Sequence, residues 1–282
     1  MRELTFTVGA EDSGTTALNF LRKHGFSQRN ITKLKHGGGL TRGGELLRTV
    51  DKVSGGEEIH VVMGDSGNED ILPNPDINAA AVYEDDDVIV FDKPPFLPVH
   101  PSIRHSNDTL ANLYAAMFPD APFRAVNRLD RNTSGLCVCA KNRFAAPLLI
   151  KSVSKVYYAV IDGIIEGSGE INLPIARTGD SIIVRMVRED GQPAVTRYKA
   201  AAHKNGRTLL EITLLTGRTH QIRVHFSHIG YPLCGDEIYG GDCSSINRQA
   251  LHCGRVAFVQ PVTGERIELE SPLPDDIRSL IE

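Results

Sequence analysis

The segment GDSGNEDILPNPDIN, residues 64–78, divides the chain into two unequal parts. It is rich in Gly, Asp, Asn and Pro, residues that favour turns and bury little apolar surface. We therefore expect a linker here, between a small unit over residues 1–63 and a larger unit over residues 79–282. A unit of about 60 residues is marginal as an independent fold, whereas the larger one can bury a sizeable core.

The small unit is predicted to be an α/β unit with one strand, two basic helices and a short strand pair. LTFTV alternates apolar and polar residues, as a half-buried strand does. Thr15 or Thr16 can cap the first helix, Ser27 can cap the second, and the glycines at 37–39 can end it. The strand pair is expected over GLTRGGELLRTV and GGEEIHVVM.

The larger unit is predicted to be α+β with a mainly antiparallel sheet and flanking helices, because its strands do not alternate regularly with helices. AVNRLD, residues 125–130, is interpreted as a strand, and alternation along it would point Arg128 and Asp130 to one face. RTHQIRVHFSHIG, from Arg218, has helix periodicity. The other expected strands include AAVYE, DVIVFDK, GLCVCAK, KVYYAVIDG, IIVRMV, VTRYKAAAH and RTLLEITLL.

The net charge of −4 hides an uneven distribution. Residues 22–48 carry seven basic residues against Glu45 alone, and residues 124–155 carry seven against Asp130 alone. Between them, residues 57–87 carry ten acidic residues and no Lys or Arg. Either basic stretch alone would most simply be a solvated face. Two such stretches on one chain favour a polyanionic partner.

Cysteine usage and hydropathy exclude other classes. Five cysteines, an odd number in a chain whose N-terminus lacks a signal-peptide pattern, argue against a disulfide framework. No paired CxxC spacing suggests zinc, and no apolar run is long enough to cross a bilayer. We expect a cytoplasmic protein that binds neither metal nor membrane.

Two segments combine charged residues with turns. In NRLDRNTSG, residues 127–135, Asp130 lies between two arginines and before a turn of small polar residues. From residue 214, LLTGRTHQIRVH predicts a strand followed at once by a helix that begins at Arg218. A helix N-terminus rich in arginine and amide donors suits phosphate or carboxylate. Asp130 by itself would more often be an ion-paired turn residue than a catalyst.

Four segments resemble the signature motifs of the RluA family of RNA pseudouridine synthases. In chain order, DKPPFLPVHPS is similar to DKPxGLxVHP, NRLDRNTSG to HRLDxxTSG, SKVYYAVIDG to KxYxAxVxG, and TGRTHQIRVH…GYPLCGDEIYG to TGRTHQIRVH…GHPxxGDxxYG. The four occur in the family's order. Residues 1–63 are similar to an S4-type RNA-binding domain, which implies RNA contact by this unit as well.

The resemblance implies an enzyme with the pseudouridine synthase fold that isomerises specific uridines to pseudouridine in structured RNA, without cofactor or metal. The target base is flipped out of the RNA first. The resemblance makes Asp130 the catalytic carboxylate, Arg223 its partner, and Tyr157 the ring against the base and a candidate for later proton removal. An adjacent arginine keeps a carboxylate ionised for nucleophilic or basic chemistry. The substrate is ribosomal or transfer RNA, and the protein is expected to be a monomer.

Two further groups of residues are assigned to RNA contact. Candidates for substrate binding around the motifs are Arg128, Thr133, Arg218, His220 and Gln221. Candidates for backbone binding on the two N-terminal helices are Arg22, Lys23, Arg29, Lys33 and Lys35. For the second group, a solvated helix face is the alternative interpretation.

Asn127 departs from the family motif, which has histidine at this position. Asparagine keeps hydrogen-bonding capacity without the ring or its charge, so a structural role is expected. The departure leaves open a second hypothesis, an RNA-binding protein that has lost catalysis. A third hypothesis, a hydrolase with Asp130 as covalent nucleophile, lacks a matched second acid or a Ser-His arrangement.

Overall fold

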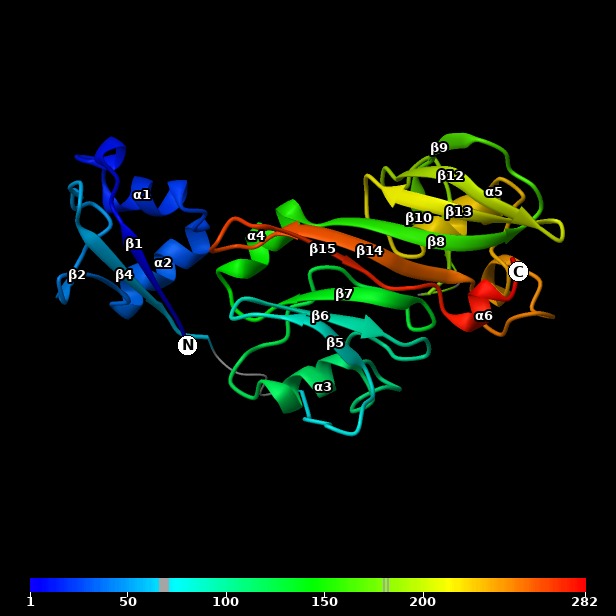
Figure 1. Ribbon diagram of the computed structural model, residues 1–282, viewed down its shortest axis with the longest axis horizontal. Coiled ribbons are helices and arrows are strands. Elements are labelled where there is room, and N and C mark those ends of the chain that lie inside the picture. The colour runs from blue at the N-terminus through cyan, green and yellow to red at the C-terminus, as the bar shows by residue number, and fades with distance from the viewer. Residues whose placement is uncertain (66–70, 180, 182) are drawn as a thin grey trace.

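The computed structural model describes residues 1–65, 71–179, 181 and 183–282. Within these residues the strands form a four-stranded sheet, a nine-stranded sheet and a two-stranded sheet. Figure 1 shows the four-stranded sheet at one end of the long axis and the nine-stranded sheet along the rest. Residues 66–70 of the expected linker, and Ile182 of the expected strand IIVRMV, lie outside the described residues.

Residues 1–63 form an antiparallel sheet with helices packed against it. The order is β1-β4-β2-β3, with β1 (Arg2–Thr7), β2 (Leu40–Arg42), β3 (Glu45–Leu46) and β4 (Glu58–Met63). The helices are η1 (Ala10–Asp12), α1 (Ala17–Lys23) and α2 (Gln28–Gly37). As predicted, the side chains of Thr16 and Ser27 cap α1 and α2 by accepting hydrogen bonds from backbone amides.

The large sheet is mixed and mainly antiparallel, as predicted. Its order is β5-β6-β7-β14-β8-β13-β12-β9, with β15 also on β14, and only β7 and β14 pair in parallel among the described strands. Its strands are β5 (Ala80–Glu84), β6 (Val88–Lys93), β7 (Ser134–Ala140), β8 (Ser154–Asp162), β9 (Ser168–Asn172), β12 (Val195–Lys204), β13 (Arg207–Leu214), β14 (Leu251–Val259) and β15 (Arg266–Glu270). A separate hairpin pairs β10 (Ile175–Arg177) with β11 (Arg185–Val187).

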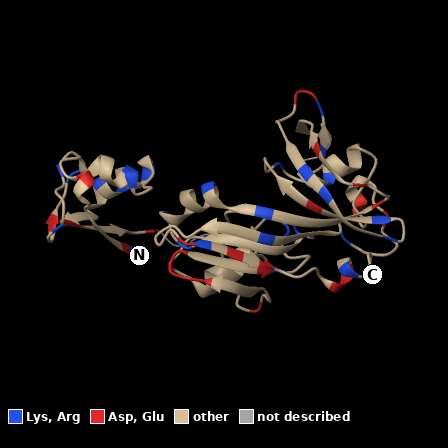
Figure 2. Ribbon diagram, turned by 45° about the horizontal axis from the view of Figure 1, so that its top comes forward, with Lys and Arg blue, Asp and Glu red and all other residues tan. Residues whose placement is uncertain are grey.

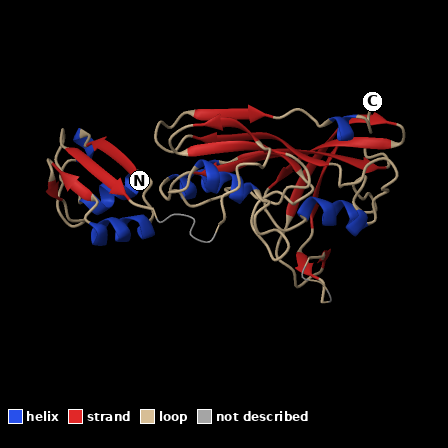
Figure 3. Cartoon of the chain, turned by 90° about the horizontal axis from the view of Figure 1, so that it is seen from below, coloured by secondary structure: helices blue, strands red, loops and turns tan. Residues whose placement is uncertain are grey.

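Helices cover this sheet mainly on one side, as Figure 3 shows. They are α3 (Leu110–Met117), α4 (Ala145–Ser152), α5 (Gln221–His228), η2 (Glu237–Tyr239) and α6 (Asp275–Arg278). The main core lies between helices and sheet, and every residue of β7 is buried. Among the described residues, no helix combines the length and hydropathy of a membrane span.

The N-terminal part is attached to the larger part by polar and aromatic contacts. Arg2 donates two hydrogen bonds of 2.9 Å to the buried carboxylate of Asp87. Phe144, at the start of α4, packs in the N-terminal core against Phe26 with ring centroids 4.7 Å apart. Asp65 accepts hydrogen bonds from arginines of the larger part. These contacts define one orientation of the basic helices relative to the large sheet. Whether residues 1–63 form a separate domain stays a prediction.

The strand predicted over residues 125–130 is wrong. Its backbone pairs with β7 at one isolated bridge, Ala125 to Cys139, where Val126 N donates to Val138 O at 2.7 Å. Beyond this bridge the side chain of Asn127 replaces the backbone ladder: it donates to Leu136 O (3.0 Å) and accepts from Val138 N (2.8 Å). The segment can therefore bend away from the sheet immediately before Asp130.

Candidate active site

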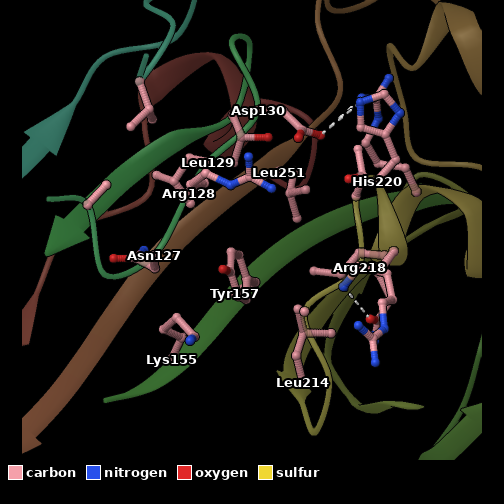
Figure 4. Close-up of a pocket in the computed structure, with 18 of the residues that line it drawn as sticks. Asn127, Arg128, Leu129, Asp130, Lys155, Tyr157, Leu214, Arg218, His220 and Leu251 are labelled. Atoms are coloured by element: carbon pink, nitrogen blue, oxygen red, sulfur yellow. Dashed lines mark hydrogen bonds and ion pairs between the residues drawn. The ribbon is translucent and has the colours of Figure 1, made fainter. Parts of the chain in front are cut away.

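The two motif segments meet at a cavity of about 990 Å³ (Figure 4). Its wall comes from the loop 125–133, from β8, from residues 214–223 and from Leu251 at the start of β14. Small-ligand sites are typically about 300–1,000 Å³. The cavity is thus large enough for a nucleotide.

Asp130 lies in this cavity and pairs with a buried arginine. Arg223 Nη1 donates to Asp130 Oδ2 at 3.1 Å, and the side chains are 5% and 28% exposed, respectively. The remaining face of the guanidinium is bonded to Asp236, with Nε and Nη2 each 2.7 Å from a carboxylate oxygen. Asp236 therefore fixes the plane of the guanidinium so that Nη1 points at Asp130.

Arg223 stays charged between these two carboxylates. Burial opposes the charge of Arg223, but its hydrogen bonds to Asp236 and the nearby charge of Asp130 raise its pKa. A guanidinium that is always charged forms a strong charge-assisted hydrogen bond to the Asp130 carboxylate and fixes its position. Sequence reasoning assigned no role to Asp236, although GDEIYGG in the fourth motif contains it.

Tyr157, rather than its neighbour Tyr158, faces the cavity. Figure 4 shows Tyr157 in the same cavity as Asp130, with Leu214 and Leu251 supplying apolar surface. Burial, then the neighbouring Cys253 and Asp130, raise the pKa of Tyr157 well above its ordinary value. A phenol that stays protonated can pack against a nucleobase. It is poorly suited to take a proton from the substrate.

The loop that carries Asp130 is held from behind by the segment 248–252, which sequence reasoning missed. Arg248 Nη1 donates to Asn132 O at 3.1 Å, and Gln249 Nε2 donates to Thr133 Oγ1 at 3.2 Å. His252 Nδ1 lies 2.9 Å from Ser134 Oγ. Three residues of this segment thus bond the successive residues Asn132, Thr133 and Ser134. Nothing in the local spacing reveals this, because it depends on the parallel pairing of β7 and β14.

Lys93, at the end of β6, binds the same loop from another direction. Its Nζ donates to Pro94 O, Leu97 O and Arg131 O at 2.8, 2.9 and 3.1 Å. Burial lowers the pKa of Lys93 to about 7. The sequence predicted no role for the lysine of the DKPP motif. The structure shows that this lysine connects the motif to Arg131, the residue after Asp130.

The substrate-binding candidates separate into two kinds. Arg128 and Arg218 are exposed at the cavity, and Arg218 Nε also donates to Pro193 O at 3.0 Å. Thr133 and Gln221 are only 1% and 2% exposed, and their side chains are bonded within the protein. Arg128 and Asp130 line one cavity even though no strand connects them.

The helix predicted to begin at Arg218 begins instead at Gln221. His220 has a left-handed backbone, with φ 58°, which interrupts the helix before Gln221. Gln221 Oε1 accepts hydrogen bonds of 2.9 Å from the Arg218 backbone and the Thr216 hydroxyl. Gln221 therefore occupies the backbone donor of Arg218, whereas the exposed guanidinium of Arg218 stays a candidate for contact with RNA.

The basic residues of the N-terminal helices also differ in availability. Lys23 is paired with Asp12 at 2.7 Å, and Arg22 donates to Gln28 at 2.8 Å. The remaining candidates are exposed on α2 and have no ion pair within the described residues; they are Arg29, Lys33 and Lys35. Figure 2 shows Lys and Arg positions on these helices at the N-terminal end of the molecule.

The sequence matches known proteins over most of its length. Residues 87–228 match the family described as RNA pseudouridylate synthase. A Bacillus subtilis relative, the uncharacterized RNA pseudouridine synthase YjbO, is 37% identical over 277 residues, covering 94% of this chain and 98% of the relative. Ribosomal large subunit pseudouridine synthase D of Pseudomonas aeruginosa is 36% identical over 302 residues, covering 99% and 93%.

A solved structure has the same fold. Human RNA Pseudouridylate Synthase Domain Containing 1 superposes with a TM-score of 0.59 at 27% identity, and covers 72% of this chain and 86% of its own. The similarity in sequence and the similarity in fold therefore indicate the same group of proteins.

Proposed function

The chain belongs to the RNA pseudouridine synthases of the RluA type, and on this premise we propose which residues isomerise uridine and in which RNA. Asp130 is the catalytic carboxylate, acting as nucleophile or base while the bond between base and ribose breaks and re-forms through carbon. Arg223 orients it through a charge-assisted hydrogen bond. Tyr157 receives the face of the flipped base, and Arg128 at the cavity mouth contacts the RNA around it.

One observation supports this proposal most strongly. The partly exposed carboxylate of Asp130 lies in a nucleotide-sized cavity, 3.1 Å from a buried arginine that Asp236 orients. The hypothesis of lost catalysis rested on Asn127, but both ends of that amide bond the backbone of β7 and neither bonds Asp130. The departure from the family histidine therefore leaves the carboxylate and its arginine in place.

The proposed substrate is ribosomal RNA of the large subunit. It is suggested by the name of the Pseudomonas aeruginosa relative, which aligns with nearly the whole chain. The protein is proposed to act as a monomer in the cytoplasm. If transfer RNA were the substrate instead, the pseudouridine made by this enzyme would be found in transfer RNA.

Mapping pseudouridine in cells with and without this gene tests the substrate. We expect one or a few large-subunit positions to lose pseudouridine in the deletion strain and to regain it with the wild-type gene, but not with Asp130→Asn. Loss confined to transfer RNA would overturn the substrate assignment. Identical maps in the two strains would contradict the proposed activity itself.

The second RNA contact is proposed for α2, and its salt dependence is measurable. Arg29 and Lys33 lie one turn apart on the exposed face, so both can reach the phosphate backbone. Each phosphate contact contributes about 0.7–0.9 to the slope of log K against log salt. The double substitution R29Q/K33Q is expected to reduce that slope by about 1.5 in a binding titration.

A matched control is available in the same part of the chain. Arg48 is also exposed, but it is already paired with Asp51 at 2.9 Å. Arg48→Gln should leave the slope unchanged. An unchanged slope for R29Q/K33Q would mean that α2 is a solvated face, as the alternative interpretation holds.

A further inference from the structure

His220 is held in an unfavourable backbone conformation beside the catalytic carboxylate. Its φ of 58° and ψ of 19° lie in the left-handed region, which is unfavourable for a residue with a Cβ. Within the described residues, only two other non-glycine residues have positive φ, Phe96 and Asn205. Such strain persists where surrounding contacts determine it, and it is concentrated at functional sites.

A short chain of hydrogen bonds orients the imidazole. The hydroxyl oxygen of Tyr239 accepts a hydrogen bond from the Arg185 backbone N–H at 3.0 Å. The same hydroxyl lies 2.8 Å from His220 Nδ1. The phenol can donate its own proton to Nδ1 while its oxygen accepts from Arg185. A neutral ring then carries its hydrogen on Nε2.

The other ring nitrogen faces Asp130. His220 Nε2 lies 3.7 Å from Asp130 Oδ2, the oxygen that also accepts from Arg223 Nη1 (Figure 4). No hydrogen bond among the described residues involves Asp130 Oδ1. Both donors thus approach one oxygen of the carboxylate and leave the other uncommitted.

Burial keeps the ring of His220 neutral near pH 7, because it lowers the pKa of His220. The charge of Asp130 raises that pKa, and the charge of Arg223 lowers it. Asp236 and Arg185 act more weakly in opposite directions, and the phenol of Tyr239 is kept protonated because burial raises its pKa. With Tyr239 donating to Nδ1, the neutral ring presents an Nε2–H donor to Asp130.

We propose that His220 is a positioning residue that, with Arg223, restrains Oδ2 of Asp130 so that Oδ1 is the oxygen that reacts with the nucleotide. This rests on the proposed role of Asp130. Protonation of His220 would place a second cation against Oδ2 and reduce the reactivity of the carboxylate. Activity should therefore fall as the pH drops through the pKa of His220, on the acid side of its usual range.

Two substitutions distinguish the positioning of Asp130 by His220 from the effect of protonating His220. His220→Asn tolerates the left-handed backbone but is too short to reach Asp130. It should lower kcat about tenfold, because Oδ2 loses one of the two groups that restrain it, with KM for RNA unchanged. His220→Gln keeps a donor and cannot titrate, so it should retain most of kcat while its acidic limb moves to lower pH.

The control is His228→Gln. His228 is exposed at the C-terminal end of α5, and this variant should match wild type in kcat, KM and pH profile. Melting temperatures of all variants establish that they are folded. A normal kcat and pH profile in both His220 variants, or an effect on KM alone, would overturn the inference. Turnover by Asp130→Asn would instead overturn the proposed function, so the two failures are distinguishable.

Discussion

Asp130→Asn is expected to abolish pseudouridine formation while leaving the fold and RNA binding intact. The substitution keeps the size of the side chain and removes the charge that either nucleophilic or basic chemistry needs. Loss of an essential catalytic group typically costs about 10⁴-fold or more in kcat. Release of tritium from RNA labelled at carbon 5 of uridine measures the turnover directly.

The fold should tolerate this change because Arg223 keeps its second partner. With Asp236 still 2.7 Å from two of its nitrogens, the guanidinium is not left as an uncompensated buried charge. We expect a melting temperature within a few degrees of wild type. Asp275→Asn, at a side chain 90% exposed, controls for the chemistry of the substitution and should be fully active. Retained turnover in Asp130→Asn would be incompatible with the assigned role.

Asp236→Asn is expected to differ from Asp130→Asn by causing a large loss of stability together with a loss of activity. Asp236 and Arg223 are 1% and 5% exposed, and their pairing is bidentate. The new amide places N–H donors against the guanidinium, leaving a buried cation with Asp130 as its one carboxylate. Breaking a buried pair from one side costs about 3–5 kcal/mol.

Thermal or urea unfolding measures this loss of stability, and we expect the melting temperature to fall by roughly 10 °C. Activity should fall as well, because Arg223 is then free to turn away from Asp130. The control is Asp190→Asn, which breaks an exposed pair with Arg188 and should change stability by no more than about 0.5 kcal/mol. A wild-type unfolding midpoint in Asp236→Asn would show that Arg223 does not need this partner.

The pairing of Asp130 with Arg223 was expected from the family resemblance, and the structure brings the two together although 93 positions separate them. The spacing alone contains no such information. Asp236, which orients the arginine, lies in the fourth motif, but the sequence predicted no role for it. A carboxylate after a glycine is typical of a turn, and its role is known only once its neighbours in space are known.

Two predictions failed where backbone geometry depends on distant groups. Residues 125–130 have the alternation of a strand, yet the Asn127 side chain, bonded to β7, replaces the ladder that a strand would form. The helix after Thr216 starts later than its periodicity suggests, because His220 is held left-handed by its contact with Tyr239. Apolar periodicity reports which side chains are buried, and it does not report the hydrogen-bond pattern of the backbone.

By itself, the amino-acid sequence determined the features that depend on neighbours along the chain: a helix cap at Thr15 or Thr16, the cap at Ser27, and the apolar run of β7. Such features form through bonds between residues a few positions apart. The tertiary structure alone decided how the catalytic loop is held. The end of β6 and the start of β14 lie beside that loop because of the order of strands in the sheet. This adjacency lets three side chains bond the loop: Lys93, Arg248 and Gln249.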